Sequence, residues 1–179
     1  FVGWNTNKDA KEGLTEIEMP SKDITIYAIY KQEVKATWIL VDNAAGSVKE
    51  ESTTCNKYNK EEVCTIETGS INLNSGYQAI GWSTTNGSIT SSVGIDVFTE
   101  IGKDTTYYSI TKKEQELKGT FHYINNGVVN TETTSCGLYN GATSCQLESP
   151  ITPLPYNGVS FASWSSSEAS NVSTTLEIS

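Results

Sequence analysis

The stretch from Ala79 to Thr111, AIGWSTTNGSITSSVGIDVFTEIGKDTTYYSIT, contains the two motifs that decide the fold of this chain. It opens on a Gly-Trp pair that ends at Trp82, and it closes on a Lys-Asp-x-Thr-x-Tyr motif that begins at Lys103. An earlier copy runs from Phe1-Val2-Gly3-Trp4 to the same closing motif at Lys22-Asp23. A third copy of the opening, Phe161-Ala162-Ser163-Trp164, follows later. Such self-similarity at a fixed spacing is typical of tandem structural repeats.

Independent markers agree on a period of about 80 residues. Cys55-Asn56-Lys57-Tyr58-Asn59 with Cys64 recurs 81 residues later as Cys136-Gly137-Leu138-Tyr139-Asn140 with Cys145. Ala36-Thr37-Trp38-Ile39 likewise resembles Gly119-Thr120-Phe121-His122. We therefore predict the C-terminal half of a repeat at 1–33, a complete repeat at 34–113, and the N-terminal part of a following repeat at 114–179. The chain is expected to be an excerpt of a longer tandem array.

Composition predicts a mainly β fold, or α+β at most. Aromatic residues make up 9% of the 179 residues, and Ser, Thr and Asn are abundant. Aromatic and β-branched side chains favour a pleated, half-buried surface. The residues expected to form strands include Ile24–Tyr30, Thr37–Val41, Tyr77–Ser83, Thr106–Thr111 and Thr120–Ile124. A helical turn is expected at most at Asp96–Ile101, because the helical periodicity there is short.

The charge balance argues against two classes of partner. The formal net charge is −9, whereas a nucleic-acid-binding surface needs concentrated basic residues. Adhesion to anionic lipid is disfavoured for the same reason. No apolar run approaches the roughly 18 residues that a spanning helix needs, so no membrane insertion is expected in this segment.

The four cysteines predict an oxidising compartment. Eight residues separate Cys55 from Cys64 and Cys136 from Cys145, and a hairpin across each spacing would bring its two sulfurs together. Four cysteines allow three pairings, of which the repeat selects these two. Local disulfides would imply an exported protein; the alternative is four free thiols in a cytosolic one. A metal site is less favoured, because His122 is the sole histidine and no Cys-x-x-Cys occurs.

The recurring aromatic residues are interpreted as core anchors of each repeat. An equivalent Trp in every copy more often fills a thin core than forms a platform for a glycan, although an aromatic platform is the alternative. The expected anchors are Trp4, Trp82, Trp164, Tyr27 and Tyr108. The Lys22-Asp23 and Lys103-Asp104 pairs are expected to form the turn into the last strand, with each Asp bonding nearby backbone amides. Their alternative is an intramolecular amide cross-link.

The remaining polar residues do not form a recognisable catalytic or cofactor site. Adjacent carboxylates in a strand, as at Glu50-Glu51 and Glu61-Glu62, point to opposite faces, and no calcium-binding spacing is present. His122 is expected at the surface or at a sheet edge. Asn86-Gly87-Ser88 and Asn171-Val172-Ser173 match the glycosylation sequon, although matches this short arise readily by chance. We therefore expect no enzyme, no metal and no cofactor.

The aromatic-x-Gly-Trp opening, a polar loop and the closing Lys-Asp-x-Thr-x-Tyr resemble the internalin-type B repeat, also called the Listeria–Bacteroides repeat. The resemblance implies β-grasp-like (ubiquitin-like) repeats strung along proteins of the bacterial cell surface. The chain departs from that pattern in its cysteine segment, in Ser163 in place of Gly, in Ala79 in place of an aromatic residue, and in Thr111, where an aromatic residue is usual.

The function that this resemblance implies is that of a non-catalytic stalk or spacer in an extracellular adhesin. The expected partners are the neighbouring repeats of the same chain and, through the incomplete end repeats, further copies by self-association. The alternative is a module whose repeats bind a host glycan or protein themselves.

Overall fold

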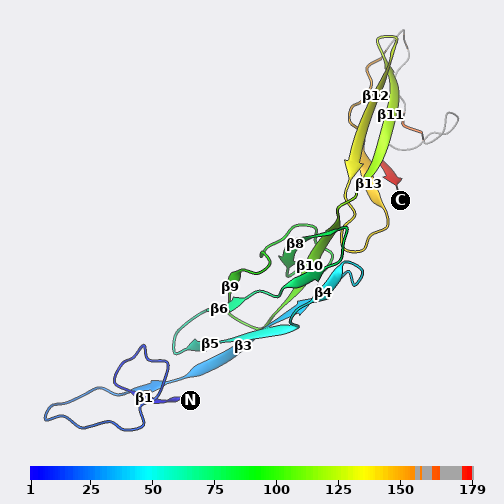
Figure 1. Cartoon of the computed structure of the whole chain (residues 1–179). Coiled ribbons are helices and arrows are strands. Elements are labelled where there is room, and N and C mark those ends of the chain that lie inside the picture. Colours follow the sequence, from blue (N-terminus) through cyan, green and yellow to red (C-terminus); the bar gives the residue numbers. More distant parts are fainter. Residues whose placement is uncertain (156–157, 159–162, 166–174, 179) are drawn as a thin grey trace. The chain divides into compact units, whose positions relative to one another are not determined.

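The computed structural model describes residues 1–155, 158, 163–165 and 175–178 of the chain, and all of its regular structure there is β (Figure 1). The predicted mainly β fold is confirmed for these residues. The helical turn expected at Asp96–Ile101 is wrong, because Phe98–Ile101 forms a strand. Phe161, Ala162 and Asn171–Ser173 lie outside the described residues.

The described residues contain fourteen strands. In chain order they are β1 Gly3–Asn5, β2 Tyr27–Ile29, β3 Lys31–Ile39, β4 Gly46–Val48, β5 Ser52–Tyr58, β6 Cys64–Glu67, β7 Ile71–Leu73, β8 Tyr77–Ser83, β9 Phe98–Ile101, β10 Thr105–Lys113, β11 Leu117–Asn125, β12 Val128–Cys136, β13 Cys145–Glu148 and β14 Thr175–Ile178.

The chain divides into two compact units. The first comprises Phe1–Val41, Gly46–Asn72 and Ile80–Ile110; the second comprises Asp42–Ala45, Leu73–Ala79 and Thr111–Ser179. This grouping follows spatial contacts rather than the sequence period. The repeat boundaries at 33/34 and 113/114 therefore stay a prediction.

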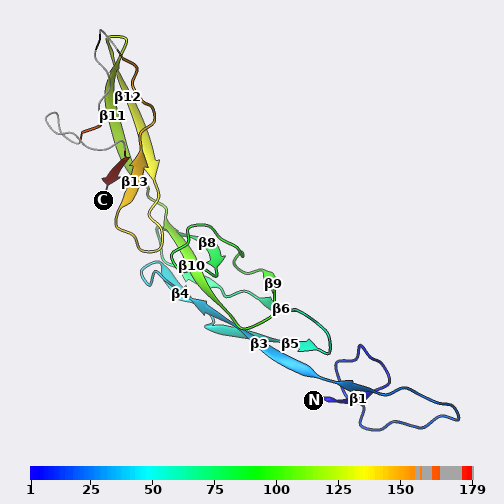
Figure 2. The ribbon, with the colours of Figure 1, turned by 180° about the vertical axis from the view of Figure 1, so that it is seen from behind.

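The first unit is built on a mixed sheet with the strand order β5-β3-β10-β8. β3 and β5 pair antiparallel and lie side by side in both views (Figure 2). β3 and β10 pair parallel, from Thr105 opposite Ala36 to Tyr108 opposite Ile39. Because parallel neighbours run in the same direction, β3 begins and β10 ends at opposite ends of the sheet.

Aromatic side chains form the core of the first unit. Trp82 is fully buried, and its indole Nε1 donates a hydrogen bond of 2.9 Å to the carbonyl oxygen of Gly69. Its ring centroid lies 5.1 Å from that of Trp38, which stacks on Tyr107 at 4.6 Å. A Cβ on Gly69 would lie 2.7 Å from Cγ of Trp38, so only glycine fits beside this ring.

Two smaller strand pairs, β6–β9 and β4–β7, complete the regular structure around this core. Ile66 of β6 and Ile101 of β9 are buried in the same cluster as the two indoles. The disulfide-bonded Cys55 and Cys64 pack against that cluster from its edge. The core is therefore closed by strands on more than one side, without a helix among the described residues.

The second unit contains the antiparallel hairpin β11–β12 and the antiparallel pair β13–β14. Asn126 and Gly127 have φ of 50° and 76° at the hairpin turn, the left-handed conformations that a two-residue hairpin loop requires. A separate core forms from Phe121, Leu147 and Trp164, with the Phe121 and Trp164 ring centroids 4.8 Å apart. Trp164 is thus the buried anchor that the sequence predicts.

The N-terminal segment corrects the predicted set of anchors. Trp4 and Tyr27 are 52% and 38% exposed on the two-stranded sheet β1–β2, so neither is a core residue. The physical reason is that β1 and β2 form a two-stranded sheet by themselves, and no third strand joins it among the described residues. Trp4 instead makes an edge contact of 5.6 Å with Phe1. Tyr108 is half-buried, and its neighbour Tyr107 is the buried residue of that strand.

Candidate functional site

The candidate site is the cysteine loop, residues 55–64, which a disulfide closes. Cys55 and Cys64 are bonded with their Cα atoms 6.0 Å apart, and Cys136 and Cys145 with theirs 6.1 Å apart. The pairing that the repeat selects is therefore confirmed. The expected hairpin between the two bonded strands is not confirmed, because β5 pairs with β3 while β6 pairs with β9. The disulfide thus ties together strands of two different sheets.

Asn59, at the tip of the cysteine loop, binds the backbone of Tyr30 from both sides. Its side-chain Oδ1 accepts a 3.0 Å hydrogen bond from the Tyr30 N–H, and its own N–H donates one of 2.9 Å to the Tyr30 carbonyl. Asn59 has φ of 52°, a left-handed conformation that asparagine tolerates better than most residues. Since Tyr30 is the one residue between β2 and β3, Asn59 holds the chain where the predicted repeats meet.

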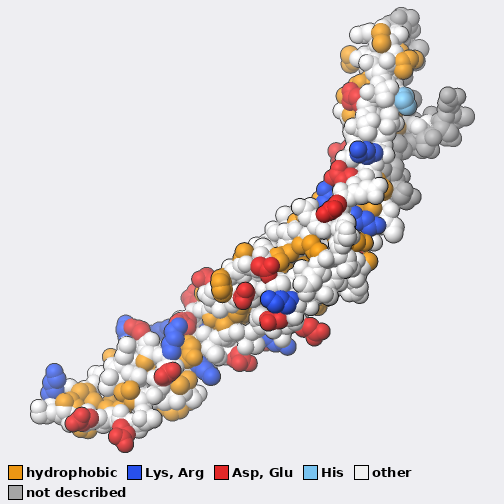
Figure 3. Space-filling model, viewed as in Figure 1, with side chains coloured by type: hydrophobic (Ala, Val, Ile, Leu, Met, Phe, Trp, Pro, Cys, Tyr) orange, Lys and Arg blue, Asp and Glu red, His pale blue; other side chains and the backbone are white. Residues whose placement is uncertain are grey.

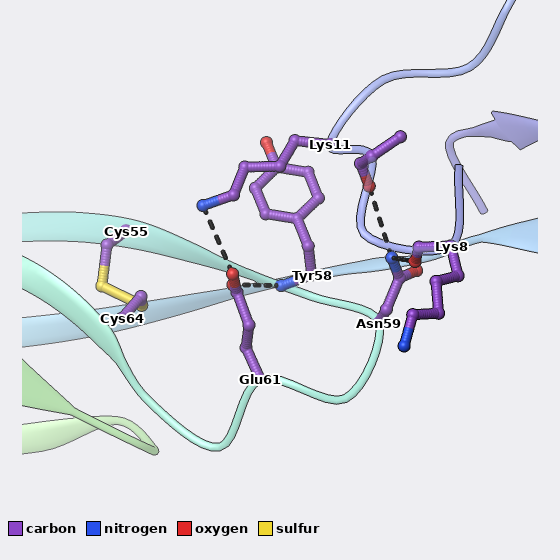
Figure 4. A network of polar contacts seen from close by, with 8 residues as sticks. Lys8, Lys11, Cys55, Tyr58, Asn59, Glu61 and Cys64 are labelled. Atoms are coloured by element: carbon purple, nitrogen blue, oxygen red, sulfur yellow. Dashed lines mark hydrogen bonds and ion pairs between the residues drawn. A yellow bond between two sulfur atoms is a disulfide. The ribbon is translucent and has the colours of Figure 1, made fainter. Parts of the chain in front are cut away.

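The same side chain also reaches the loop that follows β1. Its Nδ2 donates to the carbonyl oxygens of Lys8 and Ala10 at 2.9 and 3.3 Å. Figure 4 shows this amide between the cysteine loop and the N-terminal loop, with Lys8, Asn59 and the disulfide labelled. One asparagine thereby contacts three residues of the segment before β3.

An ion pair lies beside these hydrogen bonds. Lys11 Nζ is 3.3 Å from a carboxylate oxygen of Glu61 and 5.4 Å from the ring centroid of Tyr58 (Figure 4). The Tyr58 N–H donates a 2.8 Å hydrogen bond to the other carboxylate oxygen. This backbone hydrogen bond, and then Lys11, lowers the pKa of Glu61 below its ordinary value. Glu61 therefore stays ionised near neutral pH and is not suited to act as a general acid.

The asparagine contact recurs one period later. Asn140, 81 residues after Asn59, has the same φ of 52° and accepts a 3.1 Å hydrogen bond from the Thr111 N–H. Its own N–H donates to the Thr111 carbonyl at 2.9 Å. The neighbouring backbone pairs repeat as well. Tyr139 forms an antiparallel β-bridge with Lys112, just as Tyr58 of β5 pairs with Lys31 of β3. Two copies of the loop therefore hold two equivalent places in the chain.

A second polar cluster lies near the end of β10. Lys112 Nζ and Glu116 Oε1 are 2.6 Å apart, and the Ser135 hydroxyl donates a 2.5 Å hydrogen bond to the other carboxylate oxygen. The Lys112 hydrogen bond, and then that of Ser135, lowers the pKa of Glu116. The Lys112 Nζ lies 5.7 Å from the ring centroid of Tyr139, the residue before Asn140.

The groove beside the first cysteine loop is shallow and polar, with a volume of about 420 Å³. Its lining includes Lys11, Asn56, Tyr58, Glu61 and the disulfide. The disulfide-bonded cysteines are not nucleophiles, and the ionised Glu61 is held by Lys11. This arrangement therefore positions two stretches of backbone, the cysteine loop and the N-terminal loop.

The other residues singled out from the sequence lie apart from this loop. Asp104 Oδ1 accepts a 2.9 Å hydrogen bond from the Lys35 N–H, 69 residues away, so it binds the opening strand rather than the nearby amides expected. His122 is exposed on β11, as predicted, with Nδ1 3.0 Å from the Thr131 hydroxyl. Trp82 and Trp164 are buried and unavailable to stack on a glycan.

Sequence reasoning missed the role of the two asparagines. The available signal was the Tyr-Asn pair, which recurs at 58–59 and 139–140 within the cysteine motif. A hydrogen bond to the backbone of another segment leaves no pattern in that other segment, so Tyr30 and Thr111 could not be identified as its partners.

No protein-family model, curated protein or solved structure matches this chain. Across the described ranges there is no helix of the length and apolarity needed to cross a membrane. Acidic and basic side chains lie interspersed on the face that Figure 3 shows, with apolar side chains between them.

Proposed function

We propose that this chain is a stretch of tandem β-repeats that serves as a non-catalytic spacer or stalk in a bacterial cell-surface protein. The proposal follows the resemblance to internalin-type B repeats, and a β-grasp-like fold for the repeat is part of it. One observation carries it. The opening strand β3 and the closing strand β10 are parallel neighbours in the middle of one sheet, so the chain enters at one end and leaves at the other.

This strand arrangement suits a segment that spans a distance under load. Tyr30 alone separates β2 from β3, and three residues separate β10 from β11, so little slack lies at these two junctions. Tension along the chain would slide β3 and β10 past each other. Sliding strains the hydrogen bonds of the parallel ladder together, whereas peeling breaks them one after another.

The disulfides support the extracellular part of the proposal. Both cysteine pairs of the chain are bonded, which indicates an oxidising environment. Placement on a bacterial surface is the finer step and rests on the resemblance. Binding of a host glycan through the recurring Trp residues is less well supported, because two of the three, Trp82 and Trp164, are buried and Trp4 alone of them is exposed.

Single-molecule pulling in two geometries tests the spacer role. Handles at Lys31 and Glu114 load β3 and β10 by sliding, whereas handles at Lys31 and Lys103 pull on the same end of both strands and peel them apart. We expect a clearly higher unfolding force in the sliding geometry, because the whole ladder resists together. Equal forces in the two geometries would contradict a load-bearing spacer.

A further inference from the structure

We propose that each cysteine loop is a docking surface for the end of the repeat before it, gripped by Asn59 or Asn140 and kept in place by the disulfide. The inference deepens the proposed spacer role and rests on it only for its biological meaning. Its occupant is the backbone at Tyr30 in one case and at Thr111 in the other.

Each asparagine uses two of its own groups for this contact. One residue presents a carbonyl-type acceptor from its side chain and a donor from its backbone, so it pairs with both polar groups of a single partner residue. Tyr30 is 56% exposed, and water competes for its N–H when this pairing opens. The two hydrogen bonds between Asn59 and Tyr30, together with the ring contact of 5.7 Å between Phe1 and Tyr30, therefore hold this position of the chain.

The disulfide fixes the loop that presents the asparagine. Cys55 lies four residues before Asn59 and Cys64 five residues after it, so the bonded loop is short. A short closed loop has few conformations to lose when its tip adopts the left-handed state. Without the bond, the tip would have to be ordered each time that it binds.

Amide hydrogen exchange, measured by NMR on the full 179-residue chain, reports on the two contacts separately. The exchange rate of the Tyr30 amide reports on Asn59, and that of the Thr111 amide on Asn140. Asn59→Gly keeps the positive φ accessible and removes only the side chain. We expect it to speed exchange of the Tyr30 amide about fivefold, the net effect of one typical hydrogen bond. The Thr111 amide should not change, and Asn140→Gly should give the reverse result.

Asn126→Gly is the matched control. Asn126 is exposed and has φ of 50°, but it belongs to the β11–β12 turn. It should leave the Tyr30 and Thr111 amides unchanged. An Asn59→Gly variant with unaltered Tyr30 exchange, or an Asn126→Gly variant that accelerates it equally, would overturn the proposal.

Asn59→Asp separates the contact with Tyr30 from the contacts with Lys8 and Ala10. Aspartate keeps the oxygen that accepts from the Tyr30 N–H and loses the donors to Lys8 and Ala10. We expect the Tyr30 amide to stay protected while the backbone order parameters of residues 8–11 fall. Loss of Tyr30 protection in this variant would show that the oxygen is not what holds the strand.

Replacing both cysteines of one loop by serine tests the disulfide. The Cys55→Ser/Cys64→Ser chain should exchange the Tyr30 amide faster, while the Trp38 amide, bonded to the Glu51 carbonyl at 2.9 Å, keeps its protection. If both amides accelerate equally, the bond stabilises the whole repeat and its assignment to docking is wrong. A failure here leaves the pulling experiment unaffected, so the two proposals fail independently.

Discussion

Replacing Trp82 with phenylalanine is expected to destabilise the first unit by about 3 kcal/mol. Two effects contribute. Phenylalanine has no N–H, so the Gly69 carbonyl loses its 2.9 Å hydrogen bond in a buried place, which costs roughly 1–3 kcal/mol. The smaller ring also leaves space beside Trp38, which adds roughly 1–2 kcal/mol. Against a typical stability of about 5–15 kcal/mol, this is a large loss.

The assay is equilibrium urea unfolding followed residue by residue by NMR, with the Trp38 amide reporting on the first unit and the Phe121 amide on the second. Trp4→Phe is the control, because it is the same substitution at the equivalent repeat position on an exposed side chain. It should change stability by no more than about 0.5 kcal/mol. Equal losses in both variants, or a loss below about 1 kcal/mol for Trp82→Phe, would refute the assignment of Trp82 as the central anchor.

Three further predictions concern the core, the second disulfide and the ion pair. Gly69→Ala should lower the urea midpoint by an amount equivalent to about 1–3 kcal/mol, because the added methyl meets a buried indole; an unchanged midpoint would contradict this packing. Cys136→Ser/Cys145→Ser should cost the second unit about 2.5 kcal/mol in thermal or urea unfolding, the value expected for a loop of this length, and a near-zero cost would contradict it. The Glu61 carboxyl should titrate by NMR below the ordinary value of about 4.3, and its contribution to stability should be present above that value and fade as the pH falls through the lowered pKa. Lys11→Met should raise this pKa only in part, because the backbone hydrogen bond is the larger cause; a full return to the ordinary value would reverse that order.

The sequence predicts the features that recur in the chain. Because the period is 81 residues, a residue in one repeat is expected to have the same role as its equivalent in the next. The disulfide pairing follows from this rule, as does the buried state of Trp82 and Trp164. The rule fails at Trp4, because burial depends on a neighbour as well as on the residue itself. Trp82 packs against Trp38 of β3, whereas β1, which carries Trp4, pairs with β2 alone among the described strands.

Contacts between a side chain and a distant stretch of backbone could not be predicted from the sequence. Asp104 was expected to bond near neighbours, yet it binds an amide 69 residues away. Gly69 accepts the indole hydrogen bond through its carbonyl, a group that every residue possesses. Local preference failed at β9 as well, where pairing with β6 makes a strand of residues whose pattern suggested a helical turn.

The cysteine loop also decides what happens when the chain is cut. Lys60 is exposed between the bonded Cys55 and Cys64, where a trypsin-like protease has ready access. Hydrolysis there opens the ring without parting the molecule, since the sulfur bridge still links the two fragments. The cleaved protein would migrate as one band on a gel until a reductant is added. Cleavage at Lys60 therefore leaves the residues before and after it covalently connected.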